Sequence, residues 1–277
     1  MISGKTTLIG HIGYPTESFK APLIYNPWFE RNGVDAVVMP MGCKADNYPA
    51  FLRSLFRLTN IRGALVTMPH KVTTVDLVDE CTTTVKIAGS CNAVLLRPDG
   101  TLLGDMFDGT GFTRGLARKG FAVAGAKCLV VGAGGVGSAI AASLAADGVA
   151  AISLFDTHAA AAEGLASRLR THYPRLGVDV RSGDPAGYDL VVNGTPLGMK
   201  PGDPLPFDVA RLAPSTFVGE VVMKQEITPL LQAARERGCR YQVGTDMLFE
   251  MIPAYLEFFG FGTATPDELR AVAKVSY

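Results

Sequence analysis

The sequence predicts an α/β protein with two domains, in which short apolar strands alternate with helices along most of the chain. Three observations support this fold class. The 277 residues suffice for two domains of ordinary size. Hydrophobic residues make up 48% of the chain, which is enough to fill buried cores. A first series of strands and helices is followed by a second one that begins at Lys127, as parallel sheets with helical crossovers require.

The composition excludes several classes of protein. Lys plus Arg and Asp plus Glu each number 26, so no general charge favours nucleic acid or an anionic membrane. No apolar run has the length of a membrane span, and the first residues lack the apolar core of a signal peptide. The five cysteines are scattered, without the spacing of a zinc site. We therefore expect a cytoplasmic protein with reduced thiols and no metal, nucleic-acid partner or membrane partner.

The first series ends with a hairpin. Arg97-Pro98-Asp99-Gly100 has the residues of a tight turn between two apolar runs. Before it, a proline at the first position and a glycine stop mark one helix, and apolar residues at helical spacing mark another. The sequence thus predicts helices at Pro22–Arg31 and Tyr48–Leu58, and strands at Thr6–Gly10, Val34–Met39, Gly63–Thr67, Ala93–Leu96 and Thr101–Gly104.

A glycine-rich loop opens the second series. The apolar run Cys128–Val131 enters a G-x-G-x-x-G pattern, and an Ala-rich helix that ends at Gly148 follows it. In dinucleotide-binding folds the three glycines allow a tight turn, close approach of the backbone to a pyrophosphate, and close packing of helix on strand. A tight turn without a ligand is the alternative. The pattern predicts a doubly wound, Rossmann-type domain with cofactor contacts at Gly132, Gly134, Gly135, Val136 and Gly137.

The rest of the chain continues this domain and then becomes helical. Helices are expected at Ala159–Arg170 and Thr228–Arg237, and strands at Ala151–Phe155, Val178–Arg181, Asp189–Val192, Thr216–Gly219 and Arg240–Val243. The tail from Thr245 to Tyr277 is predicted to be helical throughout, as two helices with no further strand, the second with a capping box at Thr265-Pro266-Asp267-Glu268. We expect it to return to the first domain. The predicted domains are therefore 1–108 with 245–277, and 109–244.

Asp156 indicates which dinucleotide binds. It ends the strand after the glycine loop, about 20 residues beyond the glycines, where an acid bonds the ribose 2′-hydroxyl and would repel a 2′-phosphate. Capping of the following helix is the other role open to it. The sequence therefore favours NAD, with NADP less favoured.

Two further charged residues follow predicted strands. Lys71 comes after Gly63–Thr67, where open α/β sheets contact ligands, although a solvated surface charge would show the same spacing. Asp108 comes just before the second domain, and an Asp–Gly turn is its alternative explanation. Neither residue establishes a site by itself.

An ordered set of motifs adds a resemblance to this picture. They are Val66-Thr67-Met68-Pro69-His70-Lys71, Ala88-Gly89-Ser90-Cys91-Asn92, Leu103-Gly104-Asp105-Met106-Phe107-Asp108-Gly109, the glycine loop, and Gly194-Thr195-Pro196-Leu197-Gly198-Met199. In this order the chain resembles shikimate dehydrogenases over nearly its whole length. The resemblance implies an N-terminal α/β substrate-binding domain, a Rossmann domain, and hydride transfer between a nicotinamide cofactor and a ring carbon that carries a hydroxyl or a ketone.

The resemblance also implies roles for individual residues. Lys71 and Asp108 match the catalytic pair of the family, and Thr67 and Asn92 match positions that bond substrate hydroxyls. Positions around the cofactor match Thr195, Leu197, Met199, Val221, Val222 and Gly244.

The chain departs from the family where the substrate carboxylate is usually held. Phe19 and Ala21 stand in place of two serines, Ser18 is one position early, and Lys20 could replace the lost donors as a point charge. Further along, Leu65, Met106-Phe107, Met223 and Met251 stand where the family has polar residues. Missing partners in a polar site weaken binding strongly, so the departures argue against shikimate as the best substrate.

Two functional hypotheses remain from the sequence. The first is an NAD-dependent dehydrogenase that acts through Lys71 and Asp108 on a shikimate or quinate relative or on a less polar cyclic alcohol. Its predicted substrate contacts are Thr67, Asn92, Phe19, Ala21, Lys20 and Met251. The second is a dinucleotide-binding sensor or scaffold that has lost catalysis. In either case we expect a monomer or homodimer with a small-molecule ligand.

Overall fold

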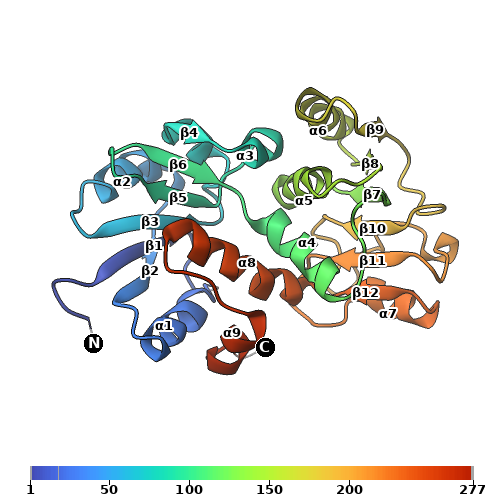
Figure 1. The fold of residues 1–277 in the computed structure, drawn as a ribbon. Helices are drawn as coiled ribbons and strands as arrows, with labels where there is room; N and C mark the ends of the chain where they lie inside the picture. The colour runs from blue at the N-terminus through green and yellow to red at the C-terminus, as the bar shows by residue number, and fades with distance from the viewer. Residues whose placement is uncertain (1, 18, 276–277) are drawn as a thin grey trace. The chain divides into compact units, whose positions relative to one another are not determined.

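The computed structural model describes residues 2–17 and 19–275, which form two compact units (Figure 1). The first unit contains the chain up to Phe107 together with the residues from Ile252 onward, and the second runs from Asp108 to Met251. The later boundary lies inside one continuous helix, beyond the residue 245 expected from the sequence. Within the described ranges, no helix is long and apolar enough to cross a membrane.

The first unit is built on a mixed six-stranded sheet in the order β2-β1-β3-β5-β6-β4. Strands β2, β1 and β3 are parallel, whereas β5 and β6 form the antiparallel hairpin that the sequence predicts. The strands span Thr7–Gly13 (β1), Ala36–Gly42 (β2), Ile61–Val66 (β3), Glu80–Cys81 (β4), Ala93–Leu96 (β5) and Leu102–Asp105 (β6).

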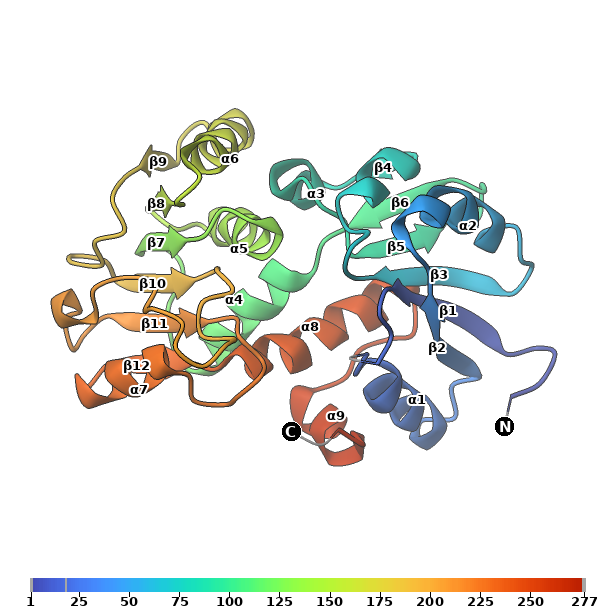
Figure 2. The same cartoon turned by 180° about the vertical axis from the view of Figure 1, so that it is seen from behind.

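Helices from both ends of the chain complete this unit. Helix α1 (Pro22–Arg31) contacts β2 and also α9 (Pro266–Val272), so the first and last helices of the chain lie side by side (Figure 2). The C-terminal half of α8 (Gly244–Phe259) packs on the sheet, where Phe259 contacts Gly63 so closely that no Cβ would fit. The remaining helices of the unit are α2 (Tyr48–Leu55) and α3 (Thr83–Ala88).

The second unit has a six-stranded sheet, parallel throughout, in the order β12-β11-β10-β7-β8-β9. The chain moves outward from β7 in one direction and then returns to β10 on the other side of β7, which is the doubly wound topology of the predicted Rossmann-type domain. The strands span Lys127–Val131 (β7), Ala151–Phe155 (β8), Gly177–Val180 (β9), Leu190–Asn193 (β10), Phe217–Glu220 (β11) and Arg240–Gln242 (β12).

Four helices and the first half of α8 accompany this sheet. Figure 1 shows α6 beside β9 and α7 beside β12, and α4 packs against α5. Their bounds are Asp108–Arg118 (α4), Gly135–Ala146 (α5), Ala159–His172 (α6) and Pro229–Glu236 (α7).

Several features differ from the sequence-based expectation, and they include the short elements β4 and α3, which were not predicted. Helix α4 was not predicted, because three glycines lower its helix propensity. These glycines serve close packing instead: a Cβ at Gly115, for example, would lie 2.8 Å from Oε1 of Gln242. The tail forms the two helices that the sequence predicts, with the capping box at Thr265, but the segment between them is not helical. Gly260 and Gly262 adopt positive φ angles of +81° and +82° between α8 and α9 and interrupt the helix.

Candidate active site

The carboxyl ends of β1 and β3 bring predicted substrate residues together. The backbone N–H of Thr67 donates to the carbonyl of Ile12 at 2.9 Å, just after β3 ends. Gly13 lies at the end of β1, where a Cβ would be 2.5 Å from Cγ2 of Thr67 and 2.9 Å from Cζ of Phe19. The glycine therefore allows Thr67 and the Phe19 ring to approach the same point of the backbone.

His70 anchors the loop that carries Lys71. Its ring stacks on Tyr48 with centroids 3.9 Å apart, and its Nε2 is 2.8 Å from the carbonyl oxygen of Cys43. The carbonyl of His70 accepts a hydrogen bond from the Thr74 hydroxyl at 2.8 Å. Burial lowers the pKa of His70. A buried, neutral histidine thus fixes the backbone next to the predicted catalytic lysine.

Asn92 links this loop to Phe107, at the end of the first unit. The N–H of Cys91 donates to the Lys71 carbonyl at 2.8 Å. Asn92 follows Cys91 in the chain, so its backbone lies close to the loop that carries Lys71. The side-chain oxygen of Asn92 accepts a hydrogen bond from the N–H of Phe107 at 2.9 Å. Asp108 follows Phe107 directly, is only 4% exposed, and is the first residue of α4.

The segment that departs from the family sequence lies just before α1. Phe19, Lys20 and Ala21 are half-buried, and Ala21 is the N-cap residue of α1 without a side-chain hydrogen bond. The Phe19 ring stacks on His11 of β1 with centroids 4.1 Å apart. Ser18 lies outside the described residues.

Several of the other departures are core residues of the first unit. Leu65 and Met106 are buried, and the ring of Phe107 packs on Tyr255 and Phe258 of α8. Part of the loss of polar groups that the sequence indicates therefore serves packing.

In the second unit, the predicted cofactor residues all follow the carboxyl ends of parallel strands. Gly132 has a φ of +100°, and a Cβ there would lie 2.8 Å from Cγ2 of Thr195 in the loop after β10. A Cβ at Gly137 would overlap the Gly132 carbonyl. In contrast, a Cβ at Gly134 would meet nothing within 4 Å. The fold itself requires the first and third glycines, and the space over Gly134 fits the close approach of a pyrophosphate.

The start of α5 offers backbone donors beside this space. Its N-cap residue is Gly134, so no side chain caps the first N–H groups of the helix. In the first turn, Gly135 is exposed and Val136 is half-buried. Such a helix start attracts phosphate through its N–H groups and its dipole.

Asp156 is bound to the glycine loop rather than to the first turn of α6. Its Oδ2 accepts from the N–H of Ala133 at 2.7 Å, and its Oδ1 accepts from the N–H of His158 at 2.8 Å. Each carboxylate oxygen can accept a second hydrogen bond, so the group can also bond a ribose hydroxyl.

A buried carboxylate holds the other two cofactor loops. Glu220 is the last residue of β11 and is fully buried. Its Oε1 accepts hydrogen bonds from the N–H groups of Val221 at 2.8 Å and Val222 at 3.1 Å. The same oxygen accepts from Nδ2 of Asn193 at 3.0 Å. Oδ1 of Asn193 in turn accepts from the Thr195 hydroxyl at 2.6 Å.

Four remaining predicted residues lie in these loops or in the adjacent helices. Gly244 begins α8, where a Cβ would lie 2.7 Å from the carbonyl carbon of Val222. Leu197 donates its N–H to the Thr195 hydroxyl at 3.1 Å, and Met199 is 40% exposed. Met251 belongs to the second unit, where it packs against Gly111 of α4.

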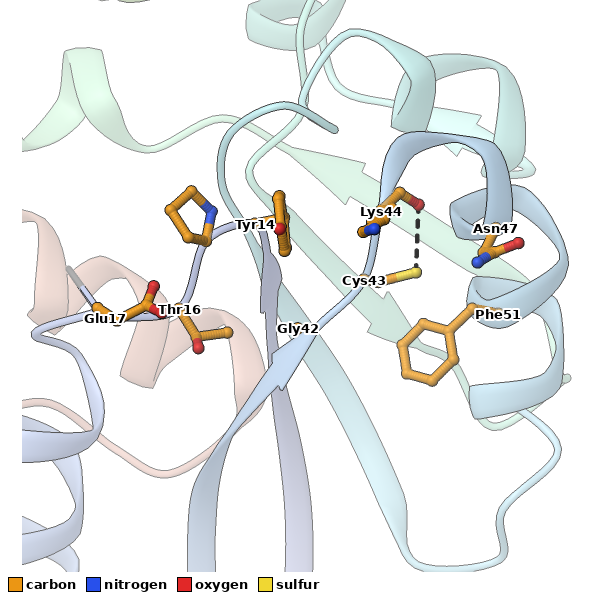
Figure 3. Close-up of a pocket in the computed structure, with 9 residues that line it drawn as sticks. Tyr14, Thr16, Glu17, Gly42, Cys43, Lys44, Asn47 and Phe51 are labelled. Atoms are coloured by element: carbon orange, nitrogen blue, oxygen red, sulfur yellow. Dashed lines mark hydrogen bonds between the residues drawn. The ribbon is translucent and has the colours of Figure 1, made fainter.

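A separate cavity of about 570 Å³ opens at the carboxyl ends of β1 and β2 (Figure 3). It contains the ammonium of Lys44, 5.9 Å from the centroid of the Tyr14 ring, and the carboxylate of Glu17. None of the predicted substrate residues lines it. The convergence of Phe19, Thr67 and Lys71 is therefore the better candidate for the substrate site.

Comparison with known proteins identifies the family of the chain. Residues 11–94 match the family model of the shikimate dehydrogenase substrate binding domain. The shikimate dehydrogenase (NADP(+)) of Acidiphilium cryptum is 36% identical over 276 residues, which cover 99% of this chain and 98% of the relative. The chain belongs to the shikimate dehydrogenase family. As a member of this family it is a dehydrogenase that acts on a CH–OH group and uses a nicotinamide cofactor.

Solved structures of the family have the same fold. A shikimate 5-dehydrogenase from Listeria monocytogenes, in complex with shikimate and NAD, superimposes with a TM-score of 0.91 at 28% identity and covers 98% of this chain and 97% of its own. A quinate dehydrogenase from Corynebacterium glutamicum, in complex with NAD, has a TM-score of 0.85 at 28% identity, with 96% and 98% covered. The predicted family membership and fold class are thus confirmed.

The structure also identifies residues that the sequence-based reasoning did not select. His11 is a polar residue within an otherwise apolar strand, and Glu220 is an acid at the end of another. Asn193 directly precedes the motif Gly194-Thr195-Pro196. The available signal was a polar residue inside a buried strand for His11, and a polar residue at the last position of a buried strand for Asn193 and Glu220.

Proposed function

We propose that this enzyme interconverts a ring hydroxyl and the corresponding ketone of a shikimate- or quinate-type compound, or of a less polar cyclic compound, with NAD as the preferred cofactor. The observation that carries the proposal is the convergence of Thr67, Lys71 and Asn92 at one edge of the first sheet. The hydrogen bond from Cys91 to Lys71 and the one from Phe107 to Asn92 connect this edge to Asp108.

Lys71 and Asp108 are the proposed proton-handling pair. The Nζ atom of Lys71 would hydrogen-bond the reacting oxygen, take its proton during oxidation and return it during reduction. The Asp108 carboxylate would orient Nζ and stabilise its charged form. NAD, when bound, supplies the hydride acceptor at the ring carbon. Thr67 and Asn92 would bond further hydroxyls of the substrate.

The preference for NAD rests on Asp156. The Asp156 carboxylate already accepts a hydrogen bond from the glycine loop. A 2′-phosphate beside it would place two negative groups together, and the next two residues, Thr157 and His158, include no arginine that could bind the phosphate. The Acidiphilium cryptum relative is named for NADP(+), and the Listeria monocytogenes structure contains NAD, so members of the family use either cofactor.

The test compares Lys71→Met with Lys86→Met, which replaces an exposed lysine of α3. With shikimate, quinate and simple cyclic alcohols as probes, we expect Lys71→Met to lose at least about a hundredfold in kcat while NAD binding stays unchanged. Full activity of Lys71→Met would overturn the proposed role of the lysine.

The NAD-binding sensor or scaffold remains the second candidate function. It is favoured by Phe19 and Ala21, which offer no hydroxyl donors at the substrate end. If the wild-type protein turns over none of the probes with NAD or NADP while it binds NAD, the sensor replaces the dehydrogenase as the proposal.

A further inference from the structure

A buried polar atom without a partner lies on the central strand β1. His11 is 8% exposed, and its Nδ1 is buried without a hydrogen-bond partner among the described residues. Such an atom destabilises the folded protein relative to one that has a hydrogen-bond partner. Its strand neighbours Ile9 and Ile12 show that an aliphatic side chain suits this strand. Packing alone therefore does not explain why a histidine occupies this position of the strand.

The neighbours of His11 are predicted substrate residues. The Phe19 ring stacks on the imidazole with an angle of 27° between the ring planes. In the sheet, His11 is paired with Pro40 on one side and with Leu65 on the other. Lys71 is close enough for its charge to act on the imidazole.

The imidazole is neutral at physiological pH. Burial and, secondarily, the positive charge of Lys71 lower the pKa of His11 to about 4. A neutral imidazole has one N–H donor and one acceptor nitrogen, and it provides no charge to balance a carboxylate.

We propose that His11 is a specificity-determining residue that hydrogen-bonds a substrate hydroxyl on the carbon next to the reacting one. This inference rests on the proposed function, in which Lys71 binds the reacting oxygen. Gly13 lies two residues after His11 on β1, and Thr67 and the Phe19 ring approach the backbone there. His11 therefore borders predicted substrate residues, of which Thr67 comes just before Lys71. The expected ligand chemistry is a vicinal diol on a ring.

A hydroxyl fits this position better than a carboxylate does. It can donate or accept, so it can pair with Nδ1 in either tautomer of the ring. A carboxylate would lose water without gaining a compensating charge from His11, and Phe19 and Ala21 offer no hydroxyl donors. Because Nδ1 is covered in this structure, its contact with a ligand requires a neighbouring group to move, and the Phe19 ring on the loop before α1 is the one that stacks on it.

The kinetic test uses two uncharged probes that differ in one hydroxyl, vicinal cyclohexanediol and cyclohexanol, each with NAD. We expect wild-type kcat/KM to favour the diol by about tenfold or more, because the second hydroxyl satisfies a buried partner. His11→Leu should lose this preference, whereas His11→Asn, which keeps a hydrogen-bonding group near Nδ1, should retain part of it. An undiminished preference in His11→Leu would overturn the inference and leave the proposed dehydrogenase intact.

Two further measurements separate specificity from structure and from turnover. His11→Leu should keep or raise the thermal midpoint, whereas His70→Leu, which removes a partnered histidine, should lower it. In protein labelled with nitrogen isotope at its four histidines, saturating diol should shift the His11 resonance and leave His70 in place. A shift at His11 without turnover would support the contact while overturning the dehydrogenase, and no shift at His11 with any probe would overturn the contact.

Discussion

The Nδ2 of Asn193 donates a hydrogen bond to Oε1 of Glu220 at 3.0 Å, and neither side chain is exposed. Oε2 of the same carboxylate accepts from the Thr228 hydroxyl at 2.9 Å, at the N-cap of α7. One buried carboxylate therefore joins the loops after β10 and β11 to the start of a helix. Buried networks of this kind fix a geometry only when every member is satisfied.

Replacing Glu220 should weaken cofactor binding according to the hydrogen bonds that remain. Glu220→Leu leaves three buried N–H donors unsatisfied, so we expect a loss of about 3 kcal/mol or more in unfolding free energy and at least about tenfold in NAD affinity. Glu220→Gln keeps one accepting oxygen, and its NAD affinity should stay within about threefold of wild type. Calorimetric titration with NAD and denaturant unfolding measure the two effects separately. Wild-type NAD affinity in Glu220→Leu would show that the network does not position the cofactor loops.

The glycine loop predicts opposite outcomes for two similar substitutions. Gly134→Ala adds a methyl group where nothing lies within 4 Å, so stability should change by less than about 0.5 kcal/mol while NAD binding falls at least about tenfold. In Gly137→Ala the added carbon overlaps the Gly132 carbonyl, and the protein itself should be destabilised by several kcal/mol, on the order of 3. Thermal unfolding with and without NAD distinguishes them. Equal stability of the two variants would contradict this division of roles.

The low pKa of His11 predicts a pH dependence of stability. Unfolding restores the usual pKa of 6.5, so between pH 6.5 and about 4 the unfolded chain binds a proton that the folded protein does not. The stabilisation is present above pH 6.5 and is lost as the pH falls, by at most roughly 3 kcal/mol. His11→Leu should flatten the slope of unfolding free energy over this interval, measured by urea denaturation at several pH values. A slope that is unchanged in the variant would mean that folding does not shift the pKa of His11.

The cofactor preference can be tested at one carboxylate. In Asp156→Ser the negative charge at the predicted ribose site is removed, so the ratio of kcat/KM for NAD over NADP should fall by about tenfold or more. Because Asp156 also accepts the N–H of Ala133, some loss of stability is expected with it. The control for that loss is Asp189→Ser. Asp189 also accepts a hydrogen bond from a backbone N–H, that of Lys127. An unchanged cofactor ratio in Asp156→Ser would assign Asp156 a purely structural role.

Local signals were sufficient for most elements. Helix α1 was predicted with its observed bounds because a proline starts it and a glycine follows its end, and both effects act within a few residues. Strand β8 was likewise predicted as Ala151–Phe155. Helix α4 was missed because its glycines oppose a helix locally, and only packing against α5, α8 and β12 explains them. The break between α8 and α9 depends on two positive φ angles, which a glycine permits but does not require.

For this protein, the sequence alone determined the α/β class, the glycine loop with Asp156, the family and the candidate pair Lys71 and Asp108, because each depends on short motifs in a fixed order. Only the tertiary structure decided that His11 lies under Phe19 within reach of the charge of Lys71, and that Glu220 and Asn193 hold the cofactor loops. These residues are far apart in the chain, and their roles arise from burial and from partners that a parallel sheet brings to one edge.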